Sequence, residues 1–369
     1  MANFLDGIEN LKKGDFTKAI EIFDELSKQG DYHASYQLAQ MYNQGINVKK
    51  DLETSGEYFD VAFKQLNDAE DSNEKLYLLS TFYLYGLGTV AKDEFKAVEL
   101  LERGAKNKDI NCMTLLANCY RNGIGSEKDD EKAFELIKDL KDSGHPIATK
   151  VYADCKMFGN GTEADYKEAV KYYEKASQLG DVSSLFMLGT LYHEGKGVEV
   201  DDKKSLEYFL EAAKYKYPDA LKNAAYFYGH GIGTEKNPKL EADFIKLYAD
   251  TGASDGMYLY GNMCLDMNRG LFKYAEGIDY LKRATQLKDP RATHLVGKIY
   301  ETGLYGTFKN EKVAFNHYLV SYNLGYKPAA FDVLRCLKMH IGVEGNNQNK
   351  IEEFEKICEE LRNLSNARA

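Results

Sequence analysis

The sequence predicts an all-α protein, a right-handed superhelical solenoid of stacked helix–loop–helix repeats. Two observations support this fold class. The 369 residues include only five prolines and no tryptophan, and 44% of them are hydrophobic, which is typical of a soluble, mainly helical chain. In addition, a short glycine-containing segment recurs along the chain at a period close to 36 residues. A fixed period of this length is typical of a solenoid, in which each repeat packs on the next one.

The recurring segment is clearest as LYHEGKGV, which runs from Leu191 to Val198. Its first glycine recurs along the chain, with Met267 at the one vacant position: Gly45, Gly86, Gly123, Gly159, Gly195, Gly231 and Gly303. A Gly-x-Gly can bind phosphate, but these glycines follow helical patterns, and the dipole at a helix C-terminus repels anions. We therefore expect Gly195 and Gly197 to end a helix in a left-handed conformation.

Each repeat predicts one helix before the glycine loop and one after it. Before the loop, a large apolar residue, a small residue and a tyrosine recur at helical spacing, as in Leu116, Ala117 and Tyr120. After the loop, an aspartate suited to a helix N-cap precedes an apolar stripe, as in Asp165 followed by Ala169 and Tyr172. The small residue allows the neighbouring helix to approach closely.

The repeated pattern A-x3-L-G-x2-Y-x2-G-x-G-V, then Asp and K-A-x2-Y-Y-x2-A-A, resembles the Sel-one-like repeat of the tetratricopeptide superfamily. Residues 184–219 match it best, and 148–179 and 292–324 match it well. The resemblance implies about eight such repeats over residues 34–328. It also implies a tetratricopeptide-like capping helix pair over residues 1–33 and capping helices over residues 329–369, and it favours a non-catalytic adaptor or scaffold.

Composition and charge narrow the function further. The net charge of −10 opposes nucleic acid or an anionic membrane as the main partner, because both favour a basic surface. No signal peptide or membrane-spanning run is present in the sequence, so we expect a cytoplasmic protein. An exported bacterial effector or host-contact protein is the alternative, with the same binding surface. The six cysteines do not have zinc-site spacing, and we expect free thiols and no cofactor.

Catalytic alternatives rest on few residues. Ser72 and Lys75 form S-x-x-K, the nucleophile motif of penicillin-binding enzymes, and relatives of this repeat family have been linked to penicillin recognition. The companion motifs S-D-N and K-T-G do not occur in the sequence. His193 and His230 occupy adjacent positions of neighbouring repeats and could share a metal, but no third ligand recurs. A hydrolase-like site or a metal site is therefore less favoured than a solvated surface.

In tetratricopeptide arrays the first helix of each repeat lines a concave groove, and this resemblance places the third, seventh, tenth and eleventh positions of each repeat on that surface. The candidate partner-binding residues are Tyr77, Tyr85, Asn118, Arg121, Lys150, Phe158, Phe186, His193, Glu194, Lys222, Tyr226, His230, Tyr258, Asn262, His294 and Lys298. We expect the partner to be a protein or peptide with a basic or amphipathic segment, bound by a monomer. Phe186, Tyr226 and Tyr258 are expected to form an aromatic ladder whose truncation abolishes binding without unfolding the protein.

Overall fold

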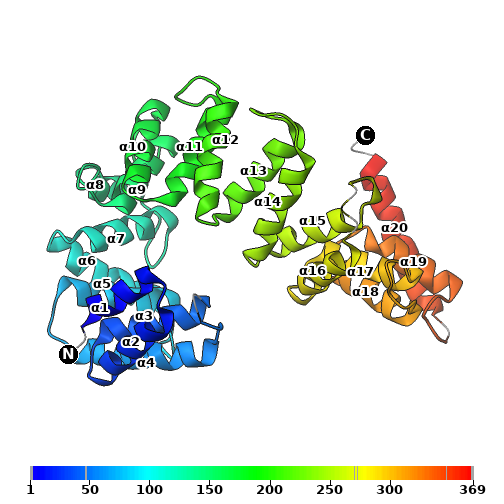
Figure 1. Ribbon diagram of the computed structural model, residues 1–369, viewed down its shortest axis with the longest axis horizontal. Coiled ribbons are helices and arrows are strands. Elements are labelled where there is room, and N and C mark those ends of the chain that lie inside the picture. The colour runs from blue at the N-terminus through cyan, green and yellow to red at the C-terminus, as the bar shows by residue number, and fades with distance from the viewer. Residues whose placement is uncertain (1–2, 46–47, 270, 272, 346, 367–369) are drawn as a thin grey trace. The chain divides into compact units, whose positions relative to one another are not determined.

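The structure is a computed structural model that describes residues 3–45, 48–269, 271, 273–345 and 347–366. Within these residues the chain forms twenty α-helices and one 3-10 turn, with no β-strand. Helices adjacent in sequence pack against one another, as α3 (Tyr32–Gln44) does with α4 (Leu52–Asp68) and α17 (Pro290–Thr302) does with α18 (Glu311–Asn323) (Figure 1). The predicted all-α solenoid of helix–loop–helix repeats is therefore confirmed.

The helices form ten consecutive pairs. The first helix of each pair is α1 (Phe4–Lys13), α3 (Tyr32–Gln44), α5 (Asn73–Tyr85), α7 (Ile110–Asn122), α9 (Pro146–Phe158), α11 (Val182–Glu194), α13 (Pro218–His230), α15 (Ser254–Leu265), α17 (Pro290–Thr302) or α19 (Ala329–Met339). The second helix is α2 (Phe16–Lys28), α4 (Leu52–Asp68), α6 (Glu94–Lys106), α8 (Asp130–Ile137), α10 (Tyr166–Gln178), α12 (Asp202–Lys214), α14 (Pro238–Asp250), α16 (Tyr274–Gln286), α18 (Glu311–Asn323) or α20 (Gln348–Asn366). The 3-10 turn η1 (Met267–Arg269) includes the position where Met267 replaces the loop glycine.

The chain divides into two compact units. Unit 1 comprises residues 1–184 and 196–198, and unit 2 comprises residues 185–195 and 199–369. Each unit contains its own hydrophobic clusters, such as the one around Phe59, Phe82 and Leu101 in unit 1 and the one around Tyr260, Tyr280 and Leu281 in unit 2. The division into capping helices at 1–33 and 329–369 and repeats between them stays a prediction, and residues 1, 2 and 367–369 lie outside the described part of the chain.

The N-cap aspartates and the loop glycines that the sequence predicted explain where the helices begin and end. Asp129, Asp165 and Asp201 each accept a hydrogen bond from a backbone N–H in the first turn of the helix that follows, which satisfies a donor that the helix leaves unpaired. At the opposite ends, Gly195 and Gly197 have φ values of +67° and +75°. The left-handed conformation predicted for these glycines is confirmed.

The second glycine of several loops is also a packing residue. A Cβ built on Gly161 would lie 2.0 Å from the carbonyl oxygen of Asp130, which begins the second helix of the preceding pair. The same approach occurs at Gly233, where a Cβ would lie 2.3 Å from the oxygen of Asp202. These loops therefore need glycine twice, once for the positive φ and once because backbone meets backbone.

The small residue of each first helix serves helix packing in a similar way. A Cβ on Gly189 would lie 2.5 Å from the ring of Phe209, and one on Gly297 would lie 2.9 Å from the ring of Tyr318. Both rings belong to the second helix of the same pair and are almost fully buried. The aromatic core therefore fills the space that the small residue leaves, and the first helix keeps its other side for other contacts.

Candidate functional site

We call the third, seventh, tenth and eleventh positions of each repeat, which lie on its first helix, the first-helix face, and describe it separately in each unit. In unit 1 the most open rings on this face are those of Tyr85 and Phe158, which are 64% and 62% exposed. Each is the last residue of its helix, directly before Gly86 or Gly159 in the left-handed conformation. Tyr77, four residues into α5, is only partly exposed and packs beside the core of unit 1.

Arg121 and Lys150, both predicted for this face, converge on one carboxylate in unit 1. Arg121 Nη1 donates to Oδ2 of Asp154 at 3.1 Å, and Lys150 Nζ forms an ion pair with the same oxygen at 3.0 Å. The other oxygen, Oδ1, accepts from the hydroxyl of Tyr173 on α10 at 2.7 Å. Burial is the main cause of the raised pKa of Tyr173, so its hydroxyl remains a donor. Asn118 lies one turn before Arg121 on α7 and is half-buried.

In unit 2 the most open ring of the face is Tyr226, which is 51% exposed. Its ring lies 4.1 Å from that of His230, measured between centroids, and His230 Nδ1 lies 2.9 Å from the carbonyl oxygen of Tyr226. One turn earlier on α13, Lys222 forms an ion pair with Asp255 at 3.4 Å. The ring of Tyr226 is thus supported from one side and open to solvent on the other.

On α15 and α17, the next two first helices of unit 2, the face carries a partly buried tyrosine, an amide and a lysine. Tyr258 is half-buried, and the guanidinium of Arg291 lies 4.5 Å from its ring centroid, a cation–π geometry. Asn262 and Lys298 are exposed, as the sequence predicted. Arg291 was not among the residues predicted for the face, because it lies just before the repeat that begins at residue 292.

Phe186 does not stand open beside Tyr226. Its ring lies 5.7 Å from that of Phe209 and 5.5 Å from that of Tyr217, and it packs onto the hydrophobic cluster of α12 and α13. The physical reason is that Tyr217, the residue before α13, lies against the third position of the preceding first helix. Of the expected ladder, Phe186 and Tyr258 are therefore both partly buried and packed against hydrophobic clusters, and only Tyr226 is exposed.

Three further predicted residues differ in how open they are. His193 is exposed, with Nδ1 at 2.6 Å from Oδ1 of Asp202 and its ring against Phe227. Glu194 is exposed at the end of α11. His294, in contrast, is buried, with Nε2 at 2.8 Å from Oδ2 of Asp332. His294 therefore joins α17 to α19 and presents little surface to a partner.

A second ion-pair network, at the end of unit 2, has the arrangement of the first with the charges exchanged. Glu301, at the tenth position of its repeat on α17, accepts two hydrogen bonds from Arg335 on α19, at 2.6 and 2.8 Å. The hydroxyl of Tyr318 on α18 also donates to Glu301. The hydrogen bonds from Arg335 hold the pKa of Glu301 below its ordinary value. Opposite charges 33 or 34 residues apart, as in Arg121 and Asp154 or Glu301 and Arg335, are the sequence signal that could have predicted these ion pairs.

The S-x-x-K segment has structural roles in unit 1. The hydroxyl of Ser72 caps α5 by accepting from the backbone N–H of Lys75. The ammonium of Lys75 donates to the carbonyl oxygens of Asn67 and Ala69, at 3.2 and 2.6 Å. Neither group is thus positioned to activate the other as a nucleophile.

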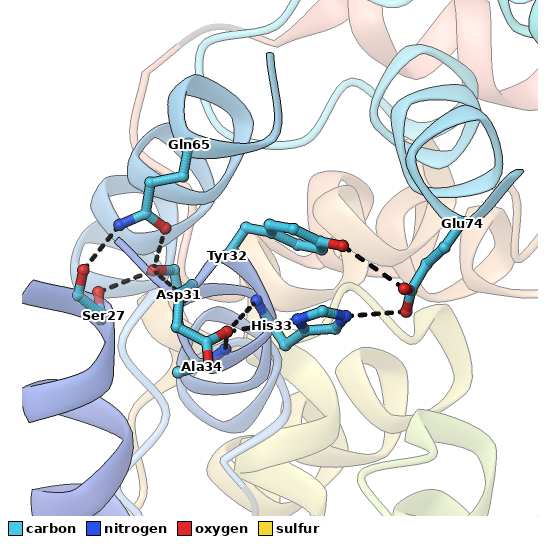
Figure 2. Close-up of polar contacts among 8 residues, drawn as sticks. Ser27, Asp31, Tyr32, His33, Ala34, Gln65 and Glu74 are labelled. Atoms are coloured by element: carbon cyan, nitrogen blue, oxygen red, sulfur yellow. Dashed lines mark hydrogen bonds and ion pairs between the residues drawn. The ribbon is translucent and has the colours of Figure 1, made fainter. Parts of the chain in front are cut away.

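Glu74, inside the same segment, ties neighbouring pairs together. Figure 2 shows its carboxylate between the hydroxyl of Tyr32 and the ring of His33, with Nε2 of His33 at 2.9 Å. Among the residues that the structure describes, no three His, Cys, Asp or Glu side chains gather as metal ligands. His193 and His230, which were considered as a shared metal site and less favoured, have separate hydrogen-bond partners, Asp202 and the carbonyl oxygen of Tyr226.

All six cysteines are buried and unpaired, as predicted. Burial raises the pKa of the Cys112 thiol to about 12 and that of Cys119 to about 11, so both thiols are protonated and unreactive at neutral pH. Within the described part of the chain, no helix is both long and apolar enough to cross a membrane.

These features define an array of helix pairs with an open face on the first helices. The Sel1 repeat matches residues 33–65, 76–109, 110–138, 148–181, 182–214, 218–240, 254–289 and 290–326. These segments cover more than half of the chain, and the protein therefore belongs to the Sel1 repeat family, as the sequence pattern indicated.

Solved structures agree with this fold. A protective antigen of uropathogenic Escherichia coli strains that displays an SLR fold is 22% identical, with a TM-score of 0.60 over 92% of this chain and 71% of that one. A Sel1 repeat protein from Oxalobacter formigenes is 21% identical, with a TM-score of 0.56 over 85% of this chain and 89% of that one. Comparison with curated proteins found no match. At these identities the likeness supports the fold alone.

Proposed function

We propose that this protein is a non-catalytic adaptor or scaffold that binds a segment of a partner protein on the first-helix face. The observation that carries the proposal is the exposure of the Tyr85, Phe158 and Tyr226 rings at positions that the core does not use. Exposed aromatic rings among amides and charges are typical of protein-binding surfaces, where aromatic anchors contribute much of the binding energy.

The partner segment in this proposal is amphipathic. Its apolar side chains contact the open rings of one unit, and its polar side chains contact exposed polar residues of the same unit, such as Asn262 and Lys298 in unit 2. The net charge of −10 increases the association rate of segments with net positive charge, an attraction that weakens with salt. The buried, protonated thiols are compatible with a cytoplasmic location, where cysteines stay reduced.

The proposal is tested by partner capture with matched variants. Partners that the wild-type protein retains from its native cells are identified, purified, and titrated against Tyr226→Ala and Phe158→Ala. The controls are Tyr215→Ala and Phe95→Ala, because these rings are 64% and 77% exposed but lie at the end of α12 and the start of α6.

Loss of an aromatic anchor costs about 2 kcal/mol, so we expect each first-helix variant to raise the Kd about 30-fold. The two controls are expected to bind like the wild type. Equal Kd values for all four variants would contradict the proposed binding face, and a larger loss in the controls would place the binding site on the second helices.

A further inference from the structure

In unit 1, two cationic side chains, Arg121 and Lys150, face the single carboxylate of Asp154. Asp154 is buried and carries one negative charge, yet both Arg121 and Lys150 form ion pairs with its Oδ2. The second oxygen is already bound by the Tyr173 hydroxyl. Two cations facing one carboxylate leave a local surplus of positive charge on a protein whose net charge is negative.

Both cations also retain donors that the protein does not use. A guanidinium has five N–H donors and an ammonium has three, whereas Arg121 makes one hydrogen bond to Asp154 and Lys150 forms one ion pair with it. Their side chains are 19% and 26% exposed, so the remaining donors are partly shielded from water but reachable. Such partly desolvated donors bind a carboxylate more strongly than fully solvated ones.

The matching network of unit 2 shows that an ion pair between successive first helices needs only one cation. There, one guanidinium, that of Arg335, bonds both Glu301 and Asp332, with Asp332 at 3.0 Å from Arg335 Nη2, and His294 contacts the other oxygen of Asp332. Its carboxylates outnumber its guanidinium, and a tyrosine hydroxyl bonds the carboxylate as in unit 1. By this comparison Arg121 is sufficient for Asp154, and Lys150 is the additional cation.

Neighbouring carboxylates do not offset the surplus by contact. Asp130, at the start of α8, has its Oδ2 at 3.1 Å from the ammonium of Lys128, so a further lysine accompanies that acid. The surrounding first-helix face is neutral: Asn118 lies one turn before Arg121 on α7, and Phe158 lies one turn after Asp154 on α9. A carboxylate that approaches Arg121 and Lys150 therefore meets two cations, an amide and an exposed ring.

We propose that Arg121 and Lys150 bind the side-chain carboxylate of an acidic residue in the partner segment, next to an apolar residue that contacts Phe158. This inference rests on the proposed function and adds the charge of one partner residue. The segment as a whole can still carry net positive charge, since long-range attraction depends on its total charge and this contact on one side chain. The partner is thus expected to be amphipathic with an acidic residue at a fixed position.

The test does not require the natural partner. The probe is N-acetyl-glutamic acid N-methylamide, compared with the corresponding glutamine derivative. Each is titrated into the full-length protein while the side-chain Nε–H resonance of Arg121 is followed by NMR. The variants are Lys150→Gln, which keeps a donor for Asp154, and Lys150→Arg as the rescue. Lys222→Gln is the control, because Lys222 is paired one-to-one with Asp255.

We expect a saturable shift of the Arg121 resonance with the glutamate derivative and not with the glutamine derivative. Because a hydrogen bond to a charged group contributes about 1.5–3 kcal/mol, Lys150→Gln should weaken the binding of the glutamate derivative about tenfold or more. Lys150→Arg should restore binding, and Lys222→Gln should leave it unchanged.

Three results would overturn the inference. They are the absence of a shift with the glutamate derivative, an undiminished shift in Lys150→Gln, and an equal shift with sodium chloride at the same concentration. Each of these is independent of the capture experiment with Tyr226→Ala and Phe158→Ala. A failure of the carboxylate site is therefore distinguishable from a failure of the first-helix face as a whole.

Discussion

The close approach of the second loop glycine to the preceding helix pair gives a sharp prediction. In Gly161→Ala the new Cβ would lie 2.0 Å from the oxygen and 2.6 Å from the carbonyl carbon of Asp130. These are backbone atoms at the start of α8, so they can move only if the loop or the helix moves. Gly144 is the matched control, because its φ of +79° is also positive and a Cβ there would meet nothing within 4 Å.

The expected loss in the free energy of unfolding follows from comparing Gly161 with Gly144: both have a positive φ, but only Gly161 lies against backbone of the preceding pair. Both substitutions force a side chain into the left-handed region, which costs about 1–2 kcal/mol. Gly161→Ala adds the cost of overpacking against a fixed backbone, typically about 1–3 kcal/mol. We therefore expect Gly144→Ala to destabilise by about 1–2 kcal/mol and Gly161→Ala by about 2–5 kcal/mol.

Native-state hydrogen exchange measures this difference locally. Because each repeat contacts mainly its neighbours, the loss of protection in Gly161→Ala should concentrate at the first turns of α8 and α10 and the loop between Gly159 and Asp165. Equal destabilisation by the two substitutions would refute the packing role of the second glycine. A loss of protection spread evenly over all helix pairs would refute the repeat-by-repeat stability.

Three further outcomes are expected. Phe186→Ala should lower the Tm and cost about 2–3 kcal/mol, because a ring packed on the core is lost, whereas Tyr226→Ala should leave the Tm nearly unchanged; equal Tm values would contradict the packing of Phe186. Alkylation without reductant should label no cysteine of the native protein and all six after denaturation, since burial raises thiol pKa values such as that of Cys112; rapid labelling of the native protein would contradict this. The pKa of Glu301 is lowered by Arg335 from its ordinary value of 4.5, so its stabilising contribution is present above that pH and is lost as the pH falls through the lowered pKa. Glu301→Gln should therefore reduce the acid sensitivity of stability, and an unchanged pH profile would exclude this contribution.

The repeat architecture could be read from the sequence because its signals are local and recur. Loop glycines such as Gly195 adopt a positive φ with less strain than other residues, and caps such as Asp165 act within one helical turn. Small residues such as Gly189 mark the positions where a ring of the second helix packs. Each of these constraints is repeated, so a single substitution, such as Met267 for the loop glycine, does not obscure the pattern.

The character of the first-helix face was harder to predict, because it depends on contacts between repeats. The third position is partly buried at both Phe186 and Tyr258, since the following repeat places Tyr217 against Phe186 and Arg291 over the ring of Tyr258. His294 is buried because Asp332 of the next pair hydrogen-bonds to it. Neither outcome follows from the position within one repeat, since both depend on which residue the following repeat supplies.

Site-specific photocrosslinking tests the central claim most directly. A photoreactive phenylalanine derivative is placed at position 226 of the full-length protein, and at position 215 in a parallel sample, since both tyrosines are exposed and lie in unit 2. We predict a covalent adduct with the captured partner from position 226, on the first-helix face, and none from position 215. An adduct from position 215 alone would contradict the account and place the partner on the second helices.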